Sequence, residues 1–545
     1  MSALSKVVLN DNKTTAQTEK ADDRQSQNNA GGYSFTVTDK DRFRRFLTIG
    51  TEGGTYYVGE SRLTDDSVKF IEKYIASAGV DAINEIVEVS DQGLAPKNDQ
   101  AIFALAVAFR SNDLAVKEAA KAAVNKVCRT ATHLFMFVGF LKNVAGMGRA
   151  KTSAIASWYE QKSNDQIAYQ AVKYRQRGGF THRDILRLAH PRGLDENVVN
   201  FMLGKEFDIT EVPSIVQAFD RLQNAKTEGE VLSAIAAHDN VSWEMIPTEF
   251  HKSPEVWKAL FKSGIPQMAL LRNVTRMARL GLFDDMVFAA DYAKALSDAK
   301  RIEKSRIHPI NYLNALVTYE EGQAQRSPFG YSYFMQRQKD WKSNAKISKA
   351  LNDGYKKAFK NVEPSGKRTF VALDVSGSMG AKASGIDLSC AQVSGALASF
   401  IAATEPYSMI RGFASEGSRY NFDAELVDLG ISESDSFNTV MKKVQQHNFG
   451  ATDCALPMKY AYDHNIEVDT FIVVTDNETY AGTGHPHEWL KKYNKKMGRN
   501  AKLVVVAATA TEFTIAEPDN PNMLDVSGFD SSTPKVIADF SAGRI

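Results

Sequence analysis

From about Asp65 to Tyr319, apolar residues recur at the spacing that places them on one face of an α-helix. Short turns containing Gly, Pro, Asn or Asp separate these segments, although no strict sequence repeat accompanies them. The pattern predicts paired helices stacked as an α-solenoid. The predicted helices are Val68–Ile75, Ala101–Phe109, Leu114–Val127, Leu134–Leu141, Ile155–Tyr159, Ile167–Tyr174, Pro213–Leu222, Val231–Ala237, Val256–Phe261, Met268–Leu280 and Tyr312–Tyr319.

The C-terminal third has a different pattern, in which short apolar runs alternate with helical periodicity. The first run begins at Phe370, and the other three are Ser408–Ala414, Thr470–Thr475 and Lys502–Ala507. Between them lie helical segments at Ile386–Thr404, Asp435–Gln446, Ala455–Tyr462 and His487–Met497. Strands that alternate with helices predict a doubly wound, mostly parallel sheet with helices on both faces, so the overall fold class is α plus α/β.

Composition places the boundaries of these regions. Residues 1–32 are polar and predict a disordered N-terminal tail. We expect a helical domain over residues 33–363 and a sheet domain over 364–545, divided at Pro364-Ser365-Gly366. The polar, aromatic segment Glu320–Lys346 predicts an excursion or linker. Because 43% of the 545 residues are hydrophobic, the chain can bury more than one core.

Cysteine usage and hydropathy bear on location. Three widely spaced cysteines (Cys128, Cys390 and Cys454) predict buried thiols rather than disulfides or a zinc site. No run approaches eighteen apolar residues, and the N-terminus lacks the layout of a secretory signal. We therefore expect a cytoplasmic protein with no membrane partner, and a monomer.

The first apolar run of the sheet domain ends in three oxygen-bearing side chains at alternate positions, Asp374, Ser376 and Ser378. Hard oxygen donors in a tight turn suit Mg²⁺ or another divalent cation. The alternative is a turn in which these side chains only cap the following helix. Two further oxygen-bearing loops, Gly450–Asp453 and Val474–Glu478, are expected at the same carboxyl edge of the sheet, where ligands of such folds collect.

These three loops resemble the metal-ion-dependent adhesion site of a von Willebrand factor A domain. The resemblance implies Asp374, Ser376, Ser378, Thr452 and Asp476 as ligands of the cation, some through water. One departure is Asn477-Glu478, because many A domains have glycine after the aspartate.

The formal net charge of +1 conceals an uneven distribution. Residues 364–545 contain 16 basic and 22 acidic residues, whereas residues 101–200 contain 15 basic and 7 acidic residues. A local basic excess is the electrostatic signature of a polyanion-binding surface. A solvated helix face is the alternative interpretation.

Lys173–His190 is the most chemically dense stretch of the basic region. Gly178-Gly179 is expected to end one helix, and Thr181 to cap the next with Asp184 in a capping box. His182 and Arg183 would then lie in the first turn, where backbone N–H groups and arginines favour phosphate. The alternative for His182 is a hydrogen-bonded histidine packed under the neighbouring helix.

Several motifs in this order resemble the Ro ribonucleoprotein family, which joins a TROVE (Telomerase, Ro and Vault) module to an A domain. The matching stretches are Phe46–Tyr57, Cys128–Phe135, Lys173–His182, Ala269–Asn273, Arg306–Pro309, Gly450–Cys454 and Thr475–Glu478. The resemblance implies a ring of HEAT-like repeats closed by the A domain. It also implies Y RNA on the outer basic surface and single-stranded ends of misfolded small RNAs in the central hole.

The charge pattern and the resemblance together suggest RNA contacts by phosphate neutralisation and base stacking. His133 and Phe180, which could stack on bases, could equally belong to the core. The predicted RNA-binding residues are Arg129, His133, Lys173, Tyr174, Arg175, Arg177, His182, Arg183 and Arg187.

Three classes of function follow from these observations. The preferred hypothesis is an RNA-binding protein that acts in the stability and quality control of small non-coding RNA. The alternative is a metal-dependent adhesion or protein-interaction module, and the two can coexist. The resemblance leaves open whether an exoribonuclease or another protein docks on the A domain. We do not expect an enzyme, because the chain has no Gly-x-Ser-x-Gly, His-Glu-x-x-His or Walker A motif.

Overall fold

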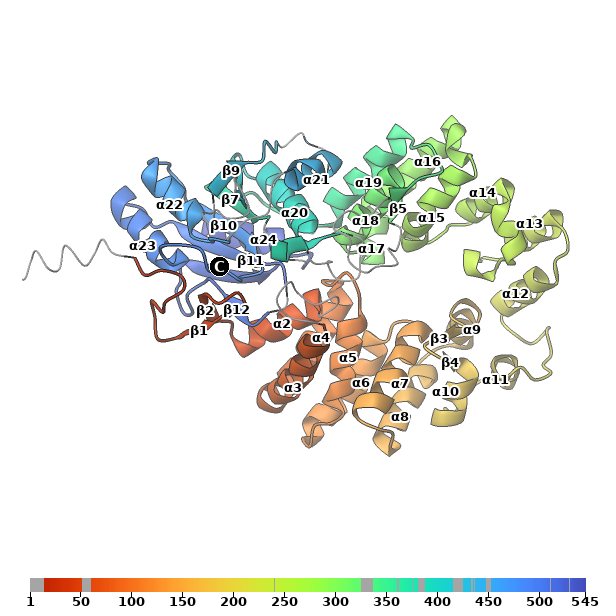
Figure 1. The fold of residues 1–545 in the computed structure, drawn as a ribbon. Helices are drawn as coiled ribbons and strands as arrows, with labels where there is room; N and C mark the ends of the chain where they lie inside the picture. Colours follow the sequence, from red (N-terminus) through yellow and green to blue (C-terminus); the bar gives the residue numbers. More distant parts are fainter. Residues whose placement is uncertain are drawn as a thin grey trace, which may run out of the picture. The chain divides into compact units, whose positions relative to one another are not determined.

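The computed structural model describes residues 14–50, 60–239, 241–324, 337–359, 362–375, 377–380, 388–414, 425–432, 435, 437–446, 452–509, 511–528 and 530–545. The chain forms two compact units (Figure 1). The helical unit comprises Val68–Gly93 and Lys97–Ala358. The sheet unit comprises the described residues up to Ser67, together with Leu94–Pro96 and those from Phe359 to Ile545.

The helical unit consists of helices that pack on their near neighbours in the chain, as the periodicity predicts. Helix α4 packs on α6, α5 on α7 and α6 on α8, whereas α12 packs on the next helix, α13, and α18 on α19. The helices are α3 (Glu60–Ala78), α4 (Val80–Gln92), α5 (Asp99–Ala108), α6 (Leu114–Val127), α7 (Ala131–Val144), α8 (Arg149–Glu160), α9 (Asn164–Lys173), α10 (His182–Ala189), α11 (Glu196–Leu203), α12 (Ser214–Asn224), α13 (Glu228–Ala237), α14 (Pro254–Lys262), α15 (Gln267–Arg279), α16 (Met286–Leu296), α17 (Ala299–Ser305), α18 (Pro309–Glu321) and α19 (Ala345–Ala358).

Short elements connect these helices. They are the strand pairs β3 (Gln176–Arg177) with β4 (Phe180–Thr181) and β5 (Gln323–Ala324) with β6 (Arg337–Gln338), and the 3₁₀ turns η1 (Trp243–Met245), η2 (Thr248–Lys252) and η3 (Leu282–Asp284). Within the predicted excursion Glu320–Lys346, α18 extends to Glu321 and α19 begins at Ala345. Residues 325–336 lie outside the described part. No described helix is both long enough and apolar enough to span a membrane.

Segments near the beginning and end of the helical unit contact each other. Arg306 follows α17, and its Nη1 lies 2.8 Å from Oδ1 of Asp91 near the end of α4. A Cβ on Gly93 would lie only 2.8 Å from the carbonyl oxygen of Arg306, so the two backbones approach closely. Residues 215 positions apart in the sequence are therefore joined within this unit.

The sheet unit has a six-stranded central sheet of order β13-β11-β10-β7-β8-β9, in which only β9 is antiparallel to its neighbour. Its strands are β7 (Arg368–Asp374), β8 (Tyr407–Ala414), β9 (Glu425–Asp428), β10 (Thr470–Thr475), β11 (Lys502–Ala507) and β13 (Met523–Ser527). The remaining elements are the 3₁₀ turn η4 (Gly377–Gly380) and helices α20 (Cys390–Thr404), α21 (Phe437–Gln445), α22 (Leu456–Asp463), α23 (Pro486–Met497) and α24 (Thr533–Ala542). The predicted doubly wound sheet is confirmed.

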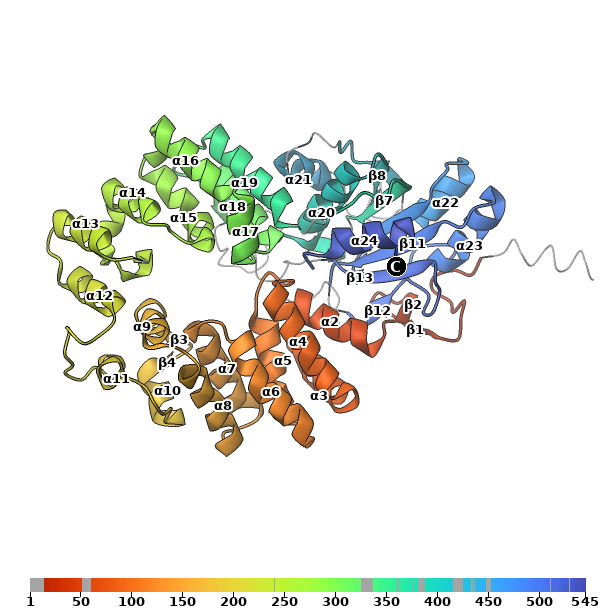
Figure 2. The same cartoon turned by 180° about the vertical axis from the view of Figure 1, so that it is seen from behind.

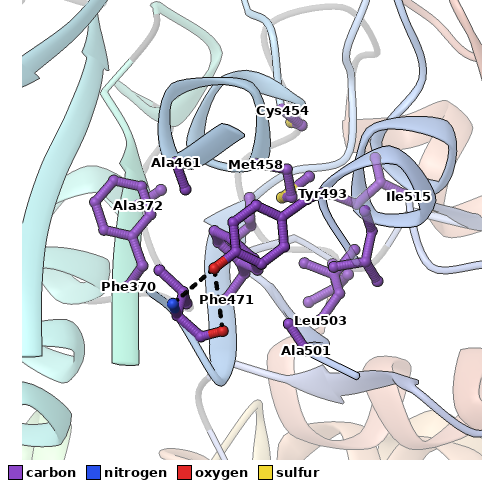
Figure 3. Close-up of a cluster of buried hydrophobic side chains, with 14 of the residues drawn as sticks. Phe370, Ala372, Cys454, Met458, Ala461, Phe471, Tyr493, Ala501, Leu503 and Ile515 are labelled. Atoms are coloured by element: carbon purple, nitrogen blue, oxygen red, sulfur yellow. Dashed lines mark hydrogen bonds between the residues drawn. The ribbon is translucent and has the colours of Figure 1, made fainter. Parts of the chain in front are cut away.

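Helices cover both faces of this sheet. On one face, alternate strand residues such as Phe370 and Phe471 pack against α22 and α23 (Figure 3). The ring of Tyr493 is buried there, and its hydroxyl donates to the carbonyl oxygen of Ile466 at 2.7 Å. On the other face, α20 packs on β7 and β8, and α24 crosses β13 (Figure 2). Strands β7, β10 and β11 are buried over nearly their whole length, which explains why their sequences are almost continuous apolar runs.

The prediction of a disordered tail over residues 1–32 is wrong for its described part, from Thr14 onward. Strand β1 (Gln25–Gln27) pairs with β2 (Tyr33–Thr36), and β2 pairs with β12 (Phe513–Thr514). Helix α2 (Asp39–Ile49) then packs on β13. The segment is polar because its side chains hydrogen-bond to the sheet unit. The described residues from Thr14 to Ser67 therefore belong to the sheet unit, whereas the sequence predicts that residues 33–67 belong to the helical domain.

Candidate functional site

The segment between α9 and α10 is a tight β-hairpin rather than a simple helix end. Arg177 pairs with Phe180, which leaves Gly178 and Gly179 as a two-residue loop. Their φ angles are 56° and 80°, and two-residue hairpin loops with positive φ at both positions strongly favour glycine. The expectation that these glycines end α9 is wrong, because α9 ends at Lys173. Helix α10 follows the hairpin directly (Figure 1).

The predicted cap of α10 is confirmed. The hydroxyl of Thr181 accepts from the backbone N–H of Asp184 at 3.4 Å, and the Asp184 carboxylate accepts from the backbone N–H of Thr181 at 2.9 Å. The Thr181 hydroxyl also donates to Oδ2 of Asp184 at 2.7 Å, and this bond, together with the one from the Thr181 backbone N–H, lowers the pKa of Asp184. A carboxylate therefore already occupies the start of this helix. An approaching phosphate is consequently attracted by the nearby arginines more than by the helix N-terminus.

His182 lies in the core of the helical unit, with 4% of its surface exposed. Its Nδ1 is 2.9 Å from the hydroxyl of Tyr159, and its Nε2 is 3.3 Å from the carbonyl oxygen of Gln170. The ring also makes an edge contact with Phe135. This placement favours the core alternative and argues against direct contact between His182 and RNA.

Four of the predicted RNA-binding arginines are exposed around this hairpin and helix. Arg175 and Arg177 are on or beside β3, and Arg183 and Arg187 lie one turn apart on α10. The guanidinium group of Arg175 lies 5.3 Å from the ring centre of Phe219. Within the described part of the chain, no carboxylate pairs with any of the four. Their positive charges are therefore available to an anionic ligand.

Aromatic side chains accompany this basic cluster. Lys173 is half-buried, and its ammonium group lies within 5.4 Å of the ring centres of both Tyr169 and Tyr174. The ammonium group of Lys142, on α7, lies 4.6 Å from the ring centre of Phe180. Lys142 belongs to no motif of the sequence that predicts RNA binding. The basic excess of residues 101–200, which includes it, was the only signal.

Arg129 and His133 are half-buried, and both make contacts within the helical unit. Arg129 donates from Nη1 to the carbonyl oxygen of Ser90 at 2.7 Å, and burial lowers its pKa. His133 is half-buried, with Nδ1 3.4 Å from the side-chain nitrogen of Asn98. Burial lowers the pKa of His133 to about 4, so its ring is neutral at pH 7. The predicted RNA-binding set thus separates into exposed arginines and packed residues.

The second candidate site lies at the carboxyl edge of the central sheet. Asp374 ends β7 and Thr475 ends the adjacent parallel strand β10. The Thr475 hydroxyl donates to Oδ2 of Asp374 at 2.8 Å. Asp476 follows directly, and its Oδ1 accepts from the backbone N–H of Glu478 at 3.0 Å. Two predicted metal ligands are therefore at neighbouring strand ends.

Backbone contacts tie the loop of Thr452 to the turn after Asp476. The carbonyl oxygen of Thr452 accepts from the N–H groups of Tyr480 and Ala481, each at 3.1 Å. The side chains of Asp374, Thr452 and Asp476 are all buried. Burial also raises the pKa of Asp453 to about 6. For Glu478, burial and the charge of Asp476 raise the pKa to about 7.

Two carboxylates and a threonine hydroxyl form a hard-oxygen donor set that fits Mg²⁺ or Mn²⁺. Of the other predicted ligands, Ser376 lies outside the described residues, as does Gly450 of the neighbouring motif, and Ser378 is described only as part of the η4 backbone. Among the described residues there is no cluster of three or more His, Cys, Asp or Glu side chains suited to a metal ion. A cation here would therefore depend on hydroxyl ligands as well as the two aspartates.

The structure explains the departure from glycine after Asp476. Asn477 has a φ of 67°, in the left-handed region that glycine adopts most readily and that asparagine tolerates. Its buried side chain accepts from the backbone N–H of Ile515 at 3.1 Å. Asn477 therefore keeps the turn that glycine would make and connects it to the neighbouring segment.

The fold and its sites define a class of protein in which an array of paired helices is combined with a von Willebrand factor A-type domain. The TROVE domain model matches residues 26–240 and 238–367, and the model described as the Ro60 vWA domain matches residues 368–541. The chain belongs to this Ro family of TROVE-domain proteins.

Named relatives span nearly the whole chain. A protein named RNA-binding protein RO60 from Deinococcus radiodurans is 34% identical over 97% of both chains. Its namesake from Caenorhabditis elegans is 31% identical over 97% of this chain and 92% of its own. The crystal structure of the Deinococcus radiodurans RO (RSR) protein superposes with a TM-score of 0.66. That match has 32% identity and covers 93% of this chain and 100% of the other.

Proposed function

We propose that this protein binds small non-coding RNA and acts in its stability and quality control. The family and the names of the relatives support RNA as the ligand. The observation that carries the proposal in this chain is the set of four exposed arginines between Arg175 and Arg187, none of them paired with a carboxylate in the described part. The ligands we propose, from the family resemblance, are Y RNA and the single-stranded ends of misfolded small RNAs.

The arginines would act mainly on the phosphate backbone. Each phosphate that is neutralised releases counterions, so affinity falls as salt rises. Tyr174 and the ring of Phe180 beneath Lys142 lie beside the cationic groups and offer surfaces on which unpaired bases could stack. His182 would support this surface from below by fixing the start of α10 against α8 and α9.

Replacing Arg183 and Arg187 together by alanine tests the proposal. The double variant should bind a small structured RNA more weakly, and the slope of log K against log salt should become less steep by about 1 to 2. Fluorescence anisotropy at several salt concentrations measures both quantities. Lys294→Ala combined with Lys300→Ala removes two exposed charges from another part of the helical unit and should leave the slope unchanged. Equal slopes for the arginine variant and the wild-type protein would exclude α10 from the interface.

We also propose that the sheet unit binds a divalent cation, through which it could contact a carboxylate of a protein partner such as an exoribonuclease. Asp374, Thr452 and Asp476 would hold the cation together with Ser376 and Ser378. The cation would supply an open coordination position for the partner's carboxylate. The buried oxygen donors at adjacent strand ends support this second function.

Asp374→Ala should abolish binding of Mn²⁺, used as a probe for Mg²⁺, and leave RNA affinity unchanged. Titration calorimetry of the full chain measures the metal, and anisotropy measures the RNA. An unchanged Mn²⁺ affinity would show that the cation does not bind at this sheet edge. In the wild-type protein, saturating Mn²⁺ should raise the melting temperature, since a ligand that binds only the folded state stabilises it. A cytoplasmic location and a monomeric state stay predictions.

A further inference from the structure

The polar N-terminal segment from Thr14 to Thr36, here called the strap, lies along the loops of the candidate cation site. Its backbone is hydrogen-bonded to those loops, with the N–H of Gln17 donating to the carbonyl oxygen of Gly482 at 2.9 Å. At its other end, β2 pairs with β12, so the strap is fixed at both ends within the sheet unit. These contacts join parts of the chain more than 400 residues apart.

Gln17 connects the two loops that contribute predicted cation ligands. Its side chain is completely buried, and Nε2 donates to Oδ1 of Asp453 at 2.7 Å and to the carbonyl oxygen of Gly484 at 3.0 Å. Its Oε1 accepts from the hydroxyl of Thr479, and that hydroxyl accepts from the N–H of Cys454. One amide group therefore spans the loop after Thr452 and the turn after Asp476.

Asn28, Asn29 and Ala30 also hydrogen-bond to the turn after Asp476. Asn29 Nδ2 donates to Oε1 of Glu478 at 2.7 Å, and the N–H of Ala30 donates to Oε2 at 3.2 Å. Asn28 Nδ2 donates to the carbonyl oxygen of Thr479 at 2.8 Å. Glu478 is buried. Without these donors, its carboxylate would lose hydrogen bonds in a buried position, which is costly.

We propose that the strap is a built-in part of the cation site, in which Gln17 and Asn29 are positioning residues for the loops that carry Thr452 and Asp476. The ligand is the divalent cation, so the inference rests on the cation site proposed above. Residues that orient ligands from outside the coordination shell typically change metal affinity by about ten- to a hundredfold when replaced. The strap supplies such residues from the far end of the chain.

The test compares three strap variants of the full chain. Gln17→Met keeps the side-chain length but removes the amide, and Asn29→Ala removes the donor to Glu478. Gln27→Ala is the matched control, because Gln27 is exposed and its amide donates only to Gly31 within the strap. We expect Mn²⁺ affinity in titration calorimetry to fall about tenfold or more in the first two variants and to stay unchanged in the control.

Hydrogen exchange without metal provides an independent measurement. The amides of Tyr480 and Ala481, which donate to Thr452, should exchange faster in Gln17→Met than in the wild-type protein. Wild-type Mn²⁺ affinity in both Gln17→Met and Asn29→Ala would overturn the proposal, whatever the exchange rates. If Gln17→Met does not fold, Asn29→Ala decides alone, because Asn29 is exposed. If the wild-type protein itself binds no Mn²⁺, the proposed cation site fails. Unchanged exchange in the variants would instead show that the strap does not hold these loops.

Discussion

The imidazole of His182 has a single favourable protonation state in the folded protein. Because a carbonyl oxygen can only accept, Nε2 carries the proton that is donated to Gln170, and Nδ1 accepts from the hydroxyl of Tyr159. A second proton would place an unscreened charge in the core, and burial accordingly lowers the pKa of His182 to about 4. The residue therefore has a structural role that depends on remaining neutral.

This neutral state makes the stability of the protein depend on pH. Unfolded His182 binds a proton near pH 6.5, whereas folded His182 does so only near pH 4. The contribution of His182 to stability should therefore be complete above about pH 6.5 and fall as the pH decreases toward 4. Each unit of pKa difference corresponds to about 1.4 kcal/mol, so the loss approaches about 3 kcal/mol. His182→Gln should be less stable at neutral pH but should lose less stability on acidification, measured by urea unfolding.

RNA binding by His182→Gln distinguishes a structural role of His182 from direct contact with RNA. We expect His182→Gln to bind RNA with nearly wild-type affinity per folded molecule and with the same dependence on salt. A large loss of affinity in a variant that melts normally would instead show that the imidazole takes part in recognition.

Other individual residues show which features of the candidate site can be predicted from neighbouring residues in the sequence. The exposure of Arg183 and Arg187 and the Thr181–Asp184 cap follow from helical spacing and local hydrogen bonding. The burial of His182 does not, because it depends on Tyr159 and Phe135 from other helices. The Gly178-Gly179 pair was correctly associated with a turn but assigned to the wrong kind, because helix ends and hairpin loops both favour glycine.

Whole elements were predictable where burial is complete on both faces. The central strands β7, β10 and β11 are buried and nearly continuous apolar runs, and each was predicted to within two residues at its start. Strand β8 was predicted to within one residue as well, although its Tyr407 is exposed and it contains Arg411. The edge strands β9 and β13 were missed because they are short and contain acidic residues, including Glu425 and Asp525. Glu425 faces solvent, whereas Asp525 is largely buried because it pairs with Arg45. In both cases an acidic residue interrupts the apolar pattern, so periodicity alone does not distinguish these strands from loops.

The strap could not have been predicted, since its ordering comes from partners more than 400 residues away. Its Asn, Gln and Asp content is typical of disorder, and here the same groups donate and accept hydrogen bonds in a buried setting. At the scale of the whole molecule, the two units therefore do not correspond to two successive stretches of sequence. The described residues from Thr14 to Ser67 belong to the same unit as the C-terminal part, and most of the helical unit lies between these two stretches in the sequence.

Arg45 on α2 connects these distant parts of the sheet unit through a buried ion pair and two hydrogen bonds. Its side chain is 1% exposed, it pairs with Asp525 of β13, and Nη1 donates to the carbonyl oxygens of Thr511 and Phe513 at 2.8 Å each. Removing it leaves the largely buried Asp525 carboxylate and two buried carbonyl groups without this donor.

Arg45→Ala should therefore destabilise the sheet unit by about 3 to 5 kcal/mol, the usual cost of breaking one side of a buried ion pair. Arg42→Ala on the same helix is the matched control, because Arg42 pairs with the more exposed Glu512 and should cost less than about 1 kcal/mol. Hydrogen exchange distinguishes the two units in one experiment. In Arg45→Ala, the amides of β10 should lose protection, whereas those of α5 and α7 should keep it, because these helices have a core of their own. RNA affinity at low temperature should also be retained. Equal losses of protection in β10 and α5 would mean that the two units unfold as one. Equal losses of stability in Arg42→Ala and Arg45→Ala would show that the buried ion pair contributes no more than the exposed one.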